Sequence, residues 1–337
     1  MKILVTGGAG FIGSEFVRSA LRGELADIGD CQVTVLDKLT YSGNLANLAP
    51  VADLPSFRFV RGDISDGSVV DQVVAGHDVI VHFAAETHVD RSIASPTQFV
   101  MTNVLGTQVL LDAAMRHGVR RFVQVSTDEV YGSIDEGSWT EATAVAPNVP
   151  YAATKAGGDL LALSYHRTFG LDVVVTRCTN NYGRYQFPEK VIPLFVTNLL
   201  DGRRIPLYGD GGNRRDWLHV SDHCRAIALV LGAGRAGEVY HIGGGTELSN
   251  VELTTRLLEA CGAGWDLVDH VPDRQGHDRR YSLDISKIKD ELGYAPRVRF
   301  EDGLAQTIDW YRSNREWWEP LRDRARFATR GELLGTL

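Results

Sequence analysis

The sequence predicts an α/β protein built on a doubly wound parallel sheet, with a smaller mixed α/β lobe beside it. Short apolar segments alternate with helical stretches over roughly the first 180 residues, and a glycine-rich segment directly follows the first apolar segment. Beyond that point the pattern loosens into prolines, glycines and aromatic residues. Alternation of buried strands with helices is typical of a parallel sheet that helices cover on both faces.

The individual elements follow from this alternation, in chain order. Strands are expected at residues 2–6, 31–36, 58–61, 78–83, 120–126, 171–177 and 238–242. The clearest helices are expected at residues 13–25, 96–117 and 151–169. We assign residues 1–180, continued by about 218–247, to the sheet domain, and residues 181–217 and 248–330 to the smaller lobe. The cleft between the two parts is the expected binding site.

The composition narrows the classes of partner. The 337 residues carry a net charge of −8, which disfavours nucleic acid and anionic membranes as partners. The chain opens on a strand-like segment without a secretory signal, and its most apolar stretches are too short to span a bilayer. The ten histidines show no metal-binding spacing. We expect a soluble, cytoplasmic protein that holds no metal.

The glycine-rich segment lies between the first expected strand and the first expected helix. Gly7, Gly10 and Gly13 give a G-x-x-G-x-x-G spacing, which permits a tight turn and brings backbone N–H groups to a pyrophosphate. In this context the spacing predicts a Rossmann-type dinucleotide-binding domain. Asp37 follows the second strand, where a carboxylate accepts hydrogen bonds from a ribose and repels the extra phosphate of NADP. The cofactor should therefore be NAD.

Residues near the ends of later strands complete the expected cofactor site. Asp63 follows the third strand and can cover the adenine with Ile64, although an Asp there is also a common turn former. Residues 83–85 follow the fourth strand and let the backbone approach the dinucleotide. The expected NAD contacts are Gly7, Gly10, Phe11, Ile12, Gly13, Asp37, Lys38, Leu39, Thr40, Asp63, Ile64, Phe83, Ala84, Ala85, Thr102, Ser126, Tyr151, Lys155 and Asn181.

Tyr151 and Lys155 form a Y-x-x-x-K pair at the start of an expected helix. A spacing of four places both side chains on one helical face, where an ammonium favours the phenolate form of a neighbouring phenol. A phenolate can take a proton from a sugar hydroxyl as a hydride leaves. The pair is uninformative by itself, because Tyr and Lys occur at this spacing in many helices.

Together with the glycine loop and residues 126–127, this pair resembles the extended short-chain dehydrogenase/reductase family over nearly the whole chain. The resemblance implies a Rossmann-type fold and NAD binding. It also implies a catalytic set of Ser or Thr, Tyr and Lys, which corresponds here to Thr127, Tyr151 and Lys155.

Asp128 and Glu129 follow at the carboxyl end of the expected strand 120–126, which faces the cofactor crevice. Epimerization at carbon 4 of a sugar needs one base, whereas removal of water across carbons 5 and 6 needs a base and an acid. Two carboxyl groups in opposite protonation states meet that need. The family resemblance implies that Asp128 is the acid and Glu129 the base. Most acidic pairs are solvated turns, and the position of this one argues for catalysis.

Further segments look like those of the dTDP-glucose 4,6-dehydratases, including residues 84–92, 180–183, 187–190, 215–220 and 276–281. The resemblance implies dTDP-glucose as the substrate. It implies contacts from Thr87, Thr127, Asn180, Lys190, Val191, Pro206, Leu207, Tyr208, Arg215, Asn250, Arg274, His277 and Tyr281. Arg184, Gln186 and Gln275 depart from the pattern of the bacterial family in the segments near the expected substrate.

Two other functions stay open at this point. The first is an epimerase, dehydratase or decarboxylase that acts on a UDP-linked sugar, which would share the fold. The second is a non-catalytic NAD-binding sensor, which would not need an intact catalytic set. The helices expected at residues 96–117 and 151–169 carry apolar residues on more than one face. Because relatives pair through the corresponding helices as a four-helix bundle, a homodimer is expected.

Overall fold

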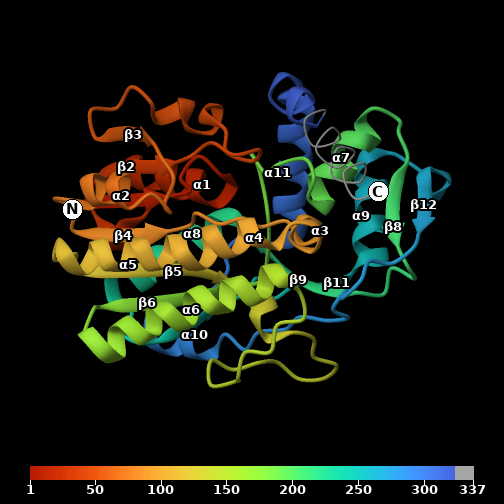
Figure 1. Cartoon of the computed structure of the whole chain (residues 1–337). Coiled ribbons are helices and arrows are strands. Elements are labelled where there is room, and N and C mark those ends of the chain that lie inside the picture. Colours follow the sequence, from red (N-terminus) through yellow and green to blue (C-terminus); the bar gives the residue numbers. More distant parts are fainter. Residues whose placement is uncertain (323–337) are drawn as a thin grey trace.

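The computed structural model describes residues 1–322, which form two parts lying side by side (Figure 1). The larger part contains a seven-stranded, all-parallel sheet in the order β10-β6-β5-β4-β1-β2-β3. Its strands are β1 (Lys2–Thr6), β2 (Gln32–Asp37), β3 (Phe57–Arg61), β4 (Val79–His82), β5 (Arg121–Thr127), β6 (Val173–Cys178) and β10 (Val239–Ile242). All seven lie where the sequence predicts them, to within two residues at each end. The predicted fold class is confirmed.

Apolar side chains alternate between the two faces of this sheet, because successive residues of a strand point in opposite directions. In β1, Ile3 and Val5 pack in one core with α1 and α8, whereas Leu4 packs in a second core with α2, α5 and α6. These helices are α1 (Phe11–Leu21), α2 (Gly67–Val74), α5 (Thr107–Arg116), α6 (Pro150–Phe169) and α8 (Val220–Ala233). The sheet is thus covered on both faces, which defines a doubly wound fold.

The smaller part has two small sheets and a core of its own. One sheet has the order β11-β9-β7 and the other pairs β12 with β8. The strands are β7 (Asn180–Tyr182), β8 (Ile205–Tyr208), β9 (Arg214–His219), β11 (Glu247–Ser249) and β12 (Val268–Val271), and the helices are α7 (Val191–Leu200), α9 (Asn250–Cys261) and α11 (Phe300–Ser313). Their apolar faces pack around the buried Trp217 and Trp318. This is the mixed α/β lobe that the sequence predicts.

The long helix expected at residues 96–117 differs from the prediction in its interior. It consists of α4 (Pro96–Phe99), a π-helical segment η3 (Val100–Gly106) and α5, and α3 (Val89–Ala94) precedes it. The helix expected at residues 13–25 begins two residues earlier, at Phe11, and ends at Leu21, before Gly23 turns the chain with a φ of +70°. Apolar periodicity does not distinguish a π-helical turn from an α-helical one, which explains the first difference.

The remaining elements are short. They are η1 (Ala26–Ile28), η2 (Leu45–Val51), η4 (Asp128–Tyr131), η5 (Trp265–Leu267) and α10 (Ser286–Leu292). Ile288 of α10 and Tyr294 after it pack in the core of the large sheet, so the chain returns to the larger part late in its course. The division of the chain at residues 180, 218 and 247 stays a prediction. Within residues 1–322, the helices lack the combination of length and apolar character that crossing a membrane requires.

Candidate active site

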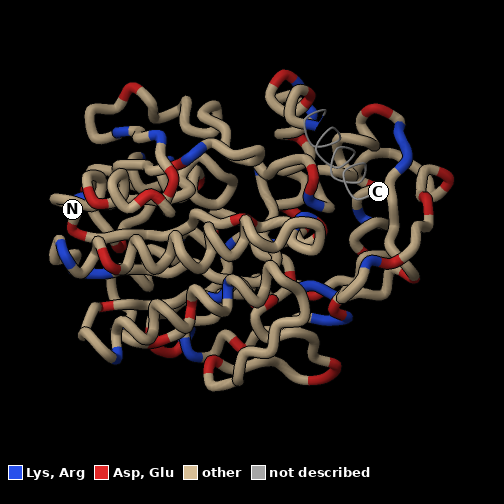
Figure 2. Tube along the Cα trace, in the orientation of Figure 1, with Lys and Arg blue, Asp and Glu red and all other residues tan. Residues whose placement is uncertain are grey.

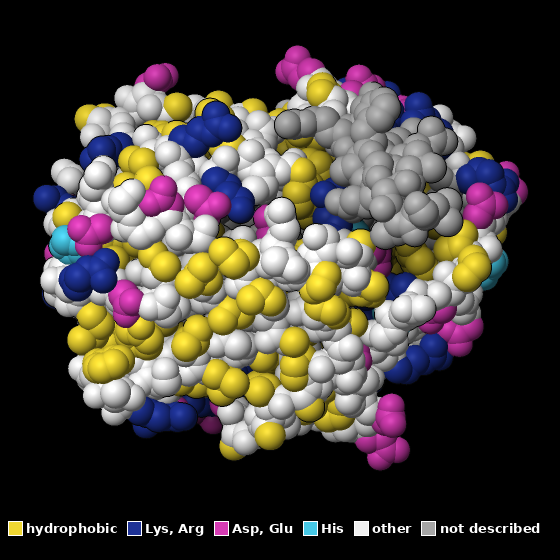
Figure 3. Space-filling view, in the orientation of Figure 1, with side chains coloured by type: hydrophobic (Ala, Val, Ile, Leu, Met, Phe, Trp, Pro, Cys, Tyr) yellow, Lys and Arg dark blue, Asp and Glu magenta, His cyan; other side chains and the backbone are white. Residues whose placement is uncertain are grey.

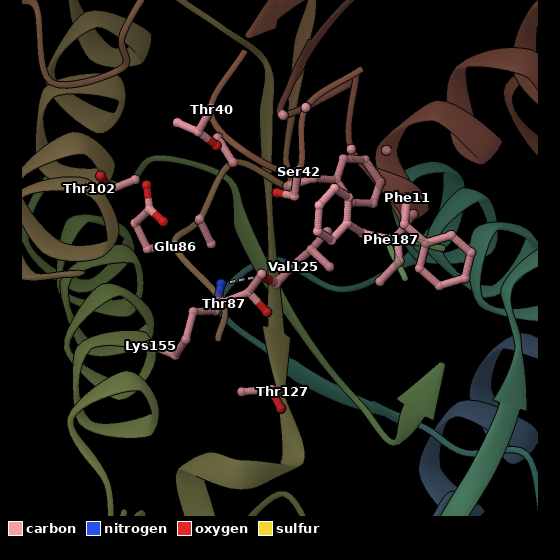
Figure 4. Close-up of a pocket in the computed structure, with 18 of the residues that line it drawn as sticks. Phe11, Thr40, Ser42, Glu86, Thr87, Thr102, Val125, Thr127, Lys155 and Phe187 are labelled. Carbon is pink, nitrogen blue, oxygen red and sulfur yellow. Dashed lines mark hydrogen bonds between the residues drawn. The ribbon is translucent and has the colours of Figure 1, made fainter. Parts of the chain in front are cut away.

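A pocket opens at the carboxyl ends of the central strands, where the strand order reverses between β1 and β4. Ligands bind at this point in open α/β sheets. The walls come from loops that follow the strands, from α6 and from residues 186–190. Figure 4 shows Lys155 of α6 with Thr127 at the end of β5, and Phe11 beside Phe187 on another wall.

The glycine-rich loop fits closely between β1 and the chain after β4. Gly7 has a φ of +69°, and a Cβ on it would lie 2.5 Å from the backbone nitrogen of Ala84, so no side chain fits. A Cβ on Gly13 would lie 2.4 Å from the carbonyl oxygen of Gly7. Helix α1 begins after Gly10, and no side chain of the described residues caps its first N–H groups. The loop therefore offers backbone donors and the positive end of a helix dipole to a pyrophosphate.

Asp37 at the end of β2 is held by two backbone donors. Its Oδ1 accepts a hydrogen bond from Leu39 N at 2.8 Å, and its Oδ2 accepts one from Ala9 N at 3.0 Å. Leu39 has a left-handed φ of 57°, after which Thr40 and Ser42 enter the pocket wall. Burial raises the pKa of Asp37, and the two backbone donors lower it. Each carboxylate oxygen keeps a lone pair for a ribose hydroxyl.

Tyr151 and Lys155 lie one turn apart on α6, and both are buried. Lys155 Nζ donates a hydrogen bond to the Val125 carbonyl at 2.7 Å (Figure 4). Burial lowers the pKa of Lys155. Burial also raises the pKa of Tyr151, the charge of Glu129 raises it further, and a hydrogen bond with Thr87 lowers it. Burial and the charge of Glu129 therefore oppose loss of the Tyr151 proton, and the expectation that Lys155 favours the phenolate stays a prediction.

Asp128 and Glu129 begin η4 directly after β5. Thr127 Oγ1 accepts a hydrogen bond from Glu129 N and donates one to Asp128 Oδ1, each at 3.3 Å. Asp128 is 2% exposed, and its Oδ2 has no hydrogen-bond partner among the described residues. Burial and the neighbouring charge of Glu129 raise the pKa of Asp128 well above its ordinary value. This environment favours a protonated Asp128.

Glu129 differs from Asp128 in the charges that face it. Burial raises the pKa of Glu129, whereas the positive charges of Lys190, Arg274 and Arg215 lower it. Lys190 Nζ donates to the Thr87 carbonyl at 3.2 Å, and Arg215 donates to the Asp278 carbonyl at 2.9 Å. Because these acceptors are uncharged backbone groups, the two cations keep positive charge that an anionic ligand can meet.

The structure brings nearly all the expected NAD contacts into this pocket. All of them line it except Leu39, and the five expected catalytic residues line it as well. Of the other expected substrate contacts, Thr87, Asn180 and Lys190 line it. The following do not: Val191, Pro206, Leu207, Tyr208, Arg215, Asn250, Arg274, His277 and Tyr281.

Several of the residues outside the pocket lining still contact one another. The Arg215 guanidinium lies 4.0 Å from the centre of the Tyr281 ring, and the Tyr208 and His277 rings are 6.3 Å apart. Asn250 is the first residue of α9, and the backbone nitrogen of Asn250 donates a hydrogen bond to the Asn213 carbonyl at 2.9 Å. The positive charge of Arg215 also lowers the pKa of Glu129, so this group lies close enough to the catalytic residues to affect their protonation.

Eleven lining residues are absent from the expected contacts: Leu36, Ser42, Gly43, Gly62, Glu86, Val125, Cys178, Thr179, Gln186, Phe187 and Glu189. Cys178 is the last residue of β6, so the rule that strand ends face the ligand could have found it. Its sulfur accepts a hydrogen bond from Asn181 Nδ2 at 3.4 Å, and burial raises the pKa of the thiol. Glu86, Gln186 and Glu189 lie in loops, and no spacing in the sequence marks them as neighbours of the pocket.

Comparison with known proteins gives matches over nearly the whole chain. The family model described as GDP-mannose 4,6 dehydratase matches residues 4–307. This chain belongs to the GDP-mannose 4,6 dehydratase family. A relative described as dTDP-glucose 4,6-dehydratase from Streptomyces niveus is 72% identical over 322 residues, which cover 96% of each chain.

Solved structures agree with this membership of the GDP-mannose 4,6 dehydratase family. The dTDP-glucose 4,6-dehydratase DesIV from Streptomyces venezuelae, solved with NAD and dTDP bound, matches with a TM-score of 0.94 at 64% identity. The match covers 95% of this chain and 100% of that one. UDP-glucose 4-epimerase from Thermotoga maritima, solved with UDP-glucose, matches with a TM-score of 0.85 at 32% identity and covers 93% and 99% of the two chains.

In this member of the GDP-mannose 4,6 dehydratase family, the three departures from the bacterial pattern lie in different surroundings. Arg184 forms an ion pair with Glu15 of α1, with 3.1 Å between the guanidinium nitrogen and the carboxylate oxygen. Gln186 lines the pocket and donates through Nε2 to the Asn181 carbonyl at 2.9 Å. Gln275 is exposed. None of the three replaces an expected catalytic residue.

Proposed function

We propose that this chain is an NAD-dependent lyase that converts dTDP-glucose into dTDP-4-keto-6-deoxyglucose and water. The observation that carries the proposal is the placement of Asp128 and Glu129 at the end of β5, in the same pocket as Tyr151. The 72% identity to a relative described as a dTDP-glucose 4,6-dehydratase supports the substrate. The 64% identity to DesIV, solved with NAD and dTDP, supports the cofactor.

The pocket fits a dinucleotide on its own geometry. The space around Gly7 and Gly13 admits no side chain, which lets backbone N–H groups meet a pyrophosphate. Asp37 is oriented to accept a ribose hydroxyl and would repel a 2′-phosphate, which favours NAD over NADP. Bound NAD supplies a hydride acceptor at the start of the cycle and a donor at its end, and its positive ring favours the Tyr151 phenolate.

The first step is oxidation at carbon 4 of the glucose. Tyr151 takes the proton of the 4-hydroxyl, and the Thr127 hydroxyl turns from Asp128 Oδ1 to donate its hydrogen bond to the same oxygen. Lys155, held by the Val125 carbonyl, adds positive charge on the side of α6 that faces the pocket. The resulting ketone acidifies the hydrogen on carbon 5, which prepares the elimination.

The second step removes water across carbons 5 and 6. Glu129 takes the proton from carbon 5 and Asp128 gives its proton to the departing 6-hydroxyl, so that the C6–O bond breaks and water leaves. The unlike charges around the two carboxyl groups support these opposite roles. Burial and the charge of Glu129 raise the pKa of Asp128, whereas three cations counteract the effect of burial on Glu129. The proton on Glu129 exchanges with solvent, and Glu129 then gives a proton to carbon 5 as carbon 6 is reduced.

In this proposal the smaller lobe, whose core includes Trp217 and Trp318, binds the nucleotide diphosphate. The division predicted from the sequence runs to residue 330, and residues 323–330 lie outside the described residues. Lys190, Arg215 and Arg274 lie close enough to Glu129 to lower its pKa, so their positive charge is concentrated on one side of the pocket. Guanidinium groups suit phosphate oxygens, and Tyr208 offers an aromatic face to a pyrimidine. His277, whose ring centre lies 6.3 Å from that of Tyr208, and Asn250 add hydrogen-bonding groups.

A homodimer is part of the same proposal. Large exposed apolar side chains gather on the outer faces of α3–α6 (Figure 3), and Figure 2 shows few charged residues along the middle of α5 and α6. The large apolar residues that are exposed on these helices and on η3 are Ile93, Val100, Met101, Leu105, Met115, Leu160 and Phe169. The inner faces of α5 and α6 already pack on the sheet, so burial in the monomer does not account for this face. A second copy of the chain would cover it.

A 4-epimerase is the main competitor. The UDP-glucose 4-epimerase match is 32% identical, and epimerization gives no role to two carboxyl groups beside Tyr151. A role in deoxysugar biosynthesis and a cytoplasmic location stay predictions.

The proposal is tested by incubating the NAD-loaded protein with dTDP-, UDP- and GDP-glucose and identifying the products. We expect a 4-keto-6-deoxy sugar, formed fastest from the dTDP sugar. Formation of galactose derivatives without loss of water would refute dehydration. Faster turnover of the UDP sugar would refute the proposed preference for a dTDP-linked substrate.

A further inference from the structure

Three side chains from distant segments meet at one edge of the pocket. Tyr41 comes from the loop after β2, Arg91 from α3 and Glu189 from the loop before α7. The Tyr41 hydroxyl donates a hydrogen bond to Glu189 Oε1 at 2.9 Å. The Arg91 guanidinium lies 3.6 Å from the centre of the Tyr41 ring, and its nitrogen lies 3.5 Å from Glu189 Oε2. We refer to Tyr41, Arg91 and Glu189 as the clasp.

The clasp is more than a surface contact. The Glu189 side chain is 8% exposed and that of Arg91 is 15% exposed, so this charge pair is largely shielded from solvent. The Tyr41 ring also contacts the Phe187 ring edge-on, with the ring centres 5.5 Å apart. His88 Nε2 lies 3.8 Å from Glu189 Oε2. Interactions in such a site are stronger than in water.

The clasp joins two walls of the pocket. On one side, Thr40 and Ser42 line the pocket and flank Tyr41 in the chain. This loop is the one that Asp37 holds through Leu39 N. On the other side, Phe187 and Glu189 line the pocket themselves. The Asp37 loop and the segment before α7 can therefore separate only if the contacts of the clasp break.

We propose that the clasp retains NAD in the pocket throughout the reaction cycle by tying the loop beside its ribose to the opposite wall. The inference rests on the proposed function, because it takes NAD to be the occupant. In the proposed reaction the hydride removed from carbon 4 must return to carbon 6 of the same sugar. Loss of the cofactor in between would leave a keto sugar that cannot be completed. A contact that slows cofactor release therefore serves this reaction directly.

The test measures release of NAD, separately from catalysis. The holoenzyme is loaded with radiolabelled NAD and mixed with a large excess of unlabelled NAD, and the label that stays with the protein is followed over time. Tyr41→Phe removes the hydroxyl and keeps the ring, and Glu189→Gln keeps the shape and removes the charge. Each change should speed release about tenfold, which corresponds to the loss of one hydrogen bond to a charged group.

The chain offers a matched control away from the pocket. Tyr240 OH donates to Glu291 Oε2 at 2.8 Å, and Arg235 pairs with Glu291 Oε1 at 2.6 Å. This trio repeats the Tyr–Arg–Glu chemistry of the clasp, but none of its members lines the pocket. Tyr240→Phe and Glu291→Gln should release label at the wild-type rate. If a clasp variant folds poorly, its companion still gives the measurement.

Three results would overturn the inference. Release from both clasp variants at the wild-type rate would show that the clasp does not retain the cofactor. Equal acceleration in the clasp and control variants would show a general loss of stability. Wild-type protein that binds no label at all would refute the proposed function itself, and the inference with it.

Discussion

At the scale of single residues, the chemistry depends on two neighbouring carboxyl groups in unlike surroundings. Asp128 is 2% exposed, with an Oδ2 that no described residue bonds, and Glu129 faces three cations. Burial raises the pKa of both, and the charge of Glu129 adds to the effect on Asp128. Two titratable groups whose pKa values are pushed apart can serve as acid and base in one step.

Replacing Asp128 by Asn should stop elimination while sparing the first oxidation. The amide keeps the size of the side chain but cannot give a proton to the 6-hydroxyl, so product formation should fall by roughly 10²- to 10⁴-fold. Rapid mixing with dTDP-glucose should show reduced nicotinamide accumulating, because the oxidised sugar waits for a step that no longer proceeds. Asp309→Asn, an exposed change on α11, is the control. Product formation by Asp128→Asn at the wild-type rate would remove Asp128 from the mechanism.

His82 provides a test of burial through the pH dependence of stability. It lies between Thr6 Oγ1 at 2.6 Å and Thr107 Oγ1 at 3.1 Å, and burial lowers its pKa from 6.5 to about 3. The folded protein keeps His82 neutral, whereas the unfolded chain protonates it below about pH 6.5. The stability that this difference provides is present above pH 6.5 and is lost as the pH falls toward 3.

We therefore expect acid to destabilise the wild type more than His82→Gln. Between pH 7 and pH 5, the wild-type free energy of unfolding should fall by about 2 kcal/mol more than that of the variant. Urea unfolding of both proteins at the two pH values measures this. A difference between the two proteins that does not change with pH would contradict the assignment.

At the scale of elements, the helix from α4 to α5 and helix α6 position the catalytic residues together. Asn103 of η3 accepts a hydrogen bond from Glu86 N at 2.9 Å and donates to the Glu86 carbonyl and to Thr154 Oγ1, each at 3.0 Å. Thr154 precedes Lys155 on α6. One side chain thus joins the chain after β4 to the helix of Tyr151 and Lys155, and π-helical turns often occur at such functional sites.

Gly158→Ala tests this packing. A Cβ on Gly158 would lie 2.8 Å from the Asn103 carbonyl oxygen, so α6 must shift away from η3. We expect a loss of about 1–3 kcal/mol in the free energy of unfolding, together with lower dehydratase activity, because Tyr151 moves with the helix. Gly67→Ala at the start of α2 is the control, since a Cβ there meets nothing within 4 Å. Equal stability and activity of the two variants would contradict tight packing at Gly158.

The elements differ in how far the sequence could predict them. The seven strands of the large sheet are short apolar runs between turn residues, and each lies within two residues of its expected position. The five strands of the smaller lobe were not predicted individually. The π-helical turn at η3 could not be predicted, because Asn103 bonds Glu86, a residue that the sequence does not mark as its neighbour. The residues of the candidate site likewise divide into those that the sequence could predict and those that it could not. Gly7, Asp37, Tyr151 and the acidic pair follow from spacing and strand ends.

Glu189 could not be predicted in the same way. Its partners Tyr41 and Arg91 are more than ninety residues away in the chain, and only the folded structure brings them together. The effects of burial and of the Glu129 charge on the pKa of Tyr151 could not be predicted either, because the spacing of Tyr151 and Lys155 reveals neither of them. Whether each expected contact binds its ligand stays a prediction.

At the scale of the whole molecule, the outer faces of α3–α6 should form a dimer interface. Leu160 is 53% exposed and Leu105 is 37% exposed on this surface (Figure 3). The double variant Leu105→Asp with Leu160→Asp would bury charge in the interface and should sediment as a monomer at concentrations where the wild type is a dimer. Leu54→Asp, 38% exposed and outside the surface, should sediment like the wild type. A monomeric wild type, or a dimeric double variant, would contradict the interface.

The central claim is that one pocket carries out oxidation, elimination and reduction on the same sugar. The most direct test is to supply dTDP-glucose that carries deuterium on carbon 4 and to locate the label in the product by mass spectrometry and NMR. The proposed reaction moves this label to carbon 6 within one molecule, and the hydrogen on carbon 5 comes from the solvent. A label that stays on carbon 4, with no exchange at carbon 5, would contradict dehydration and leave an epimerase in its place.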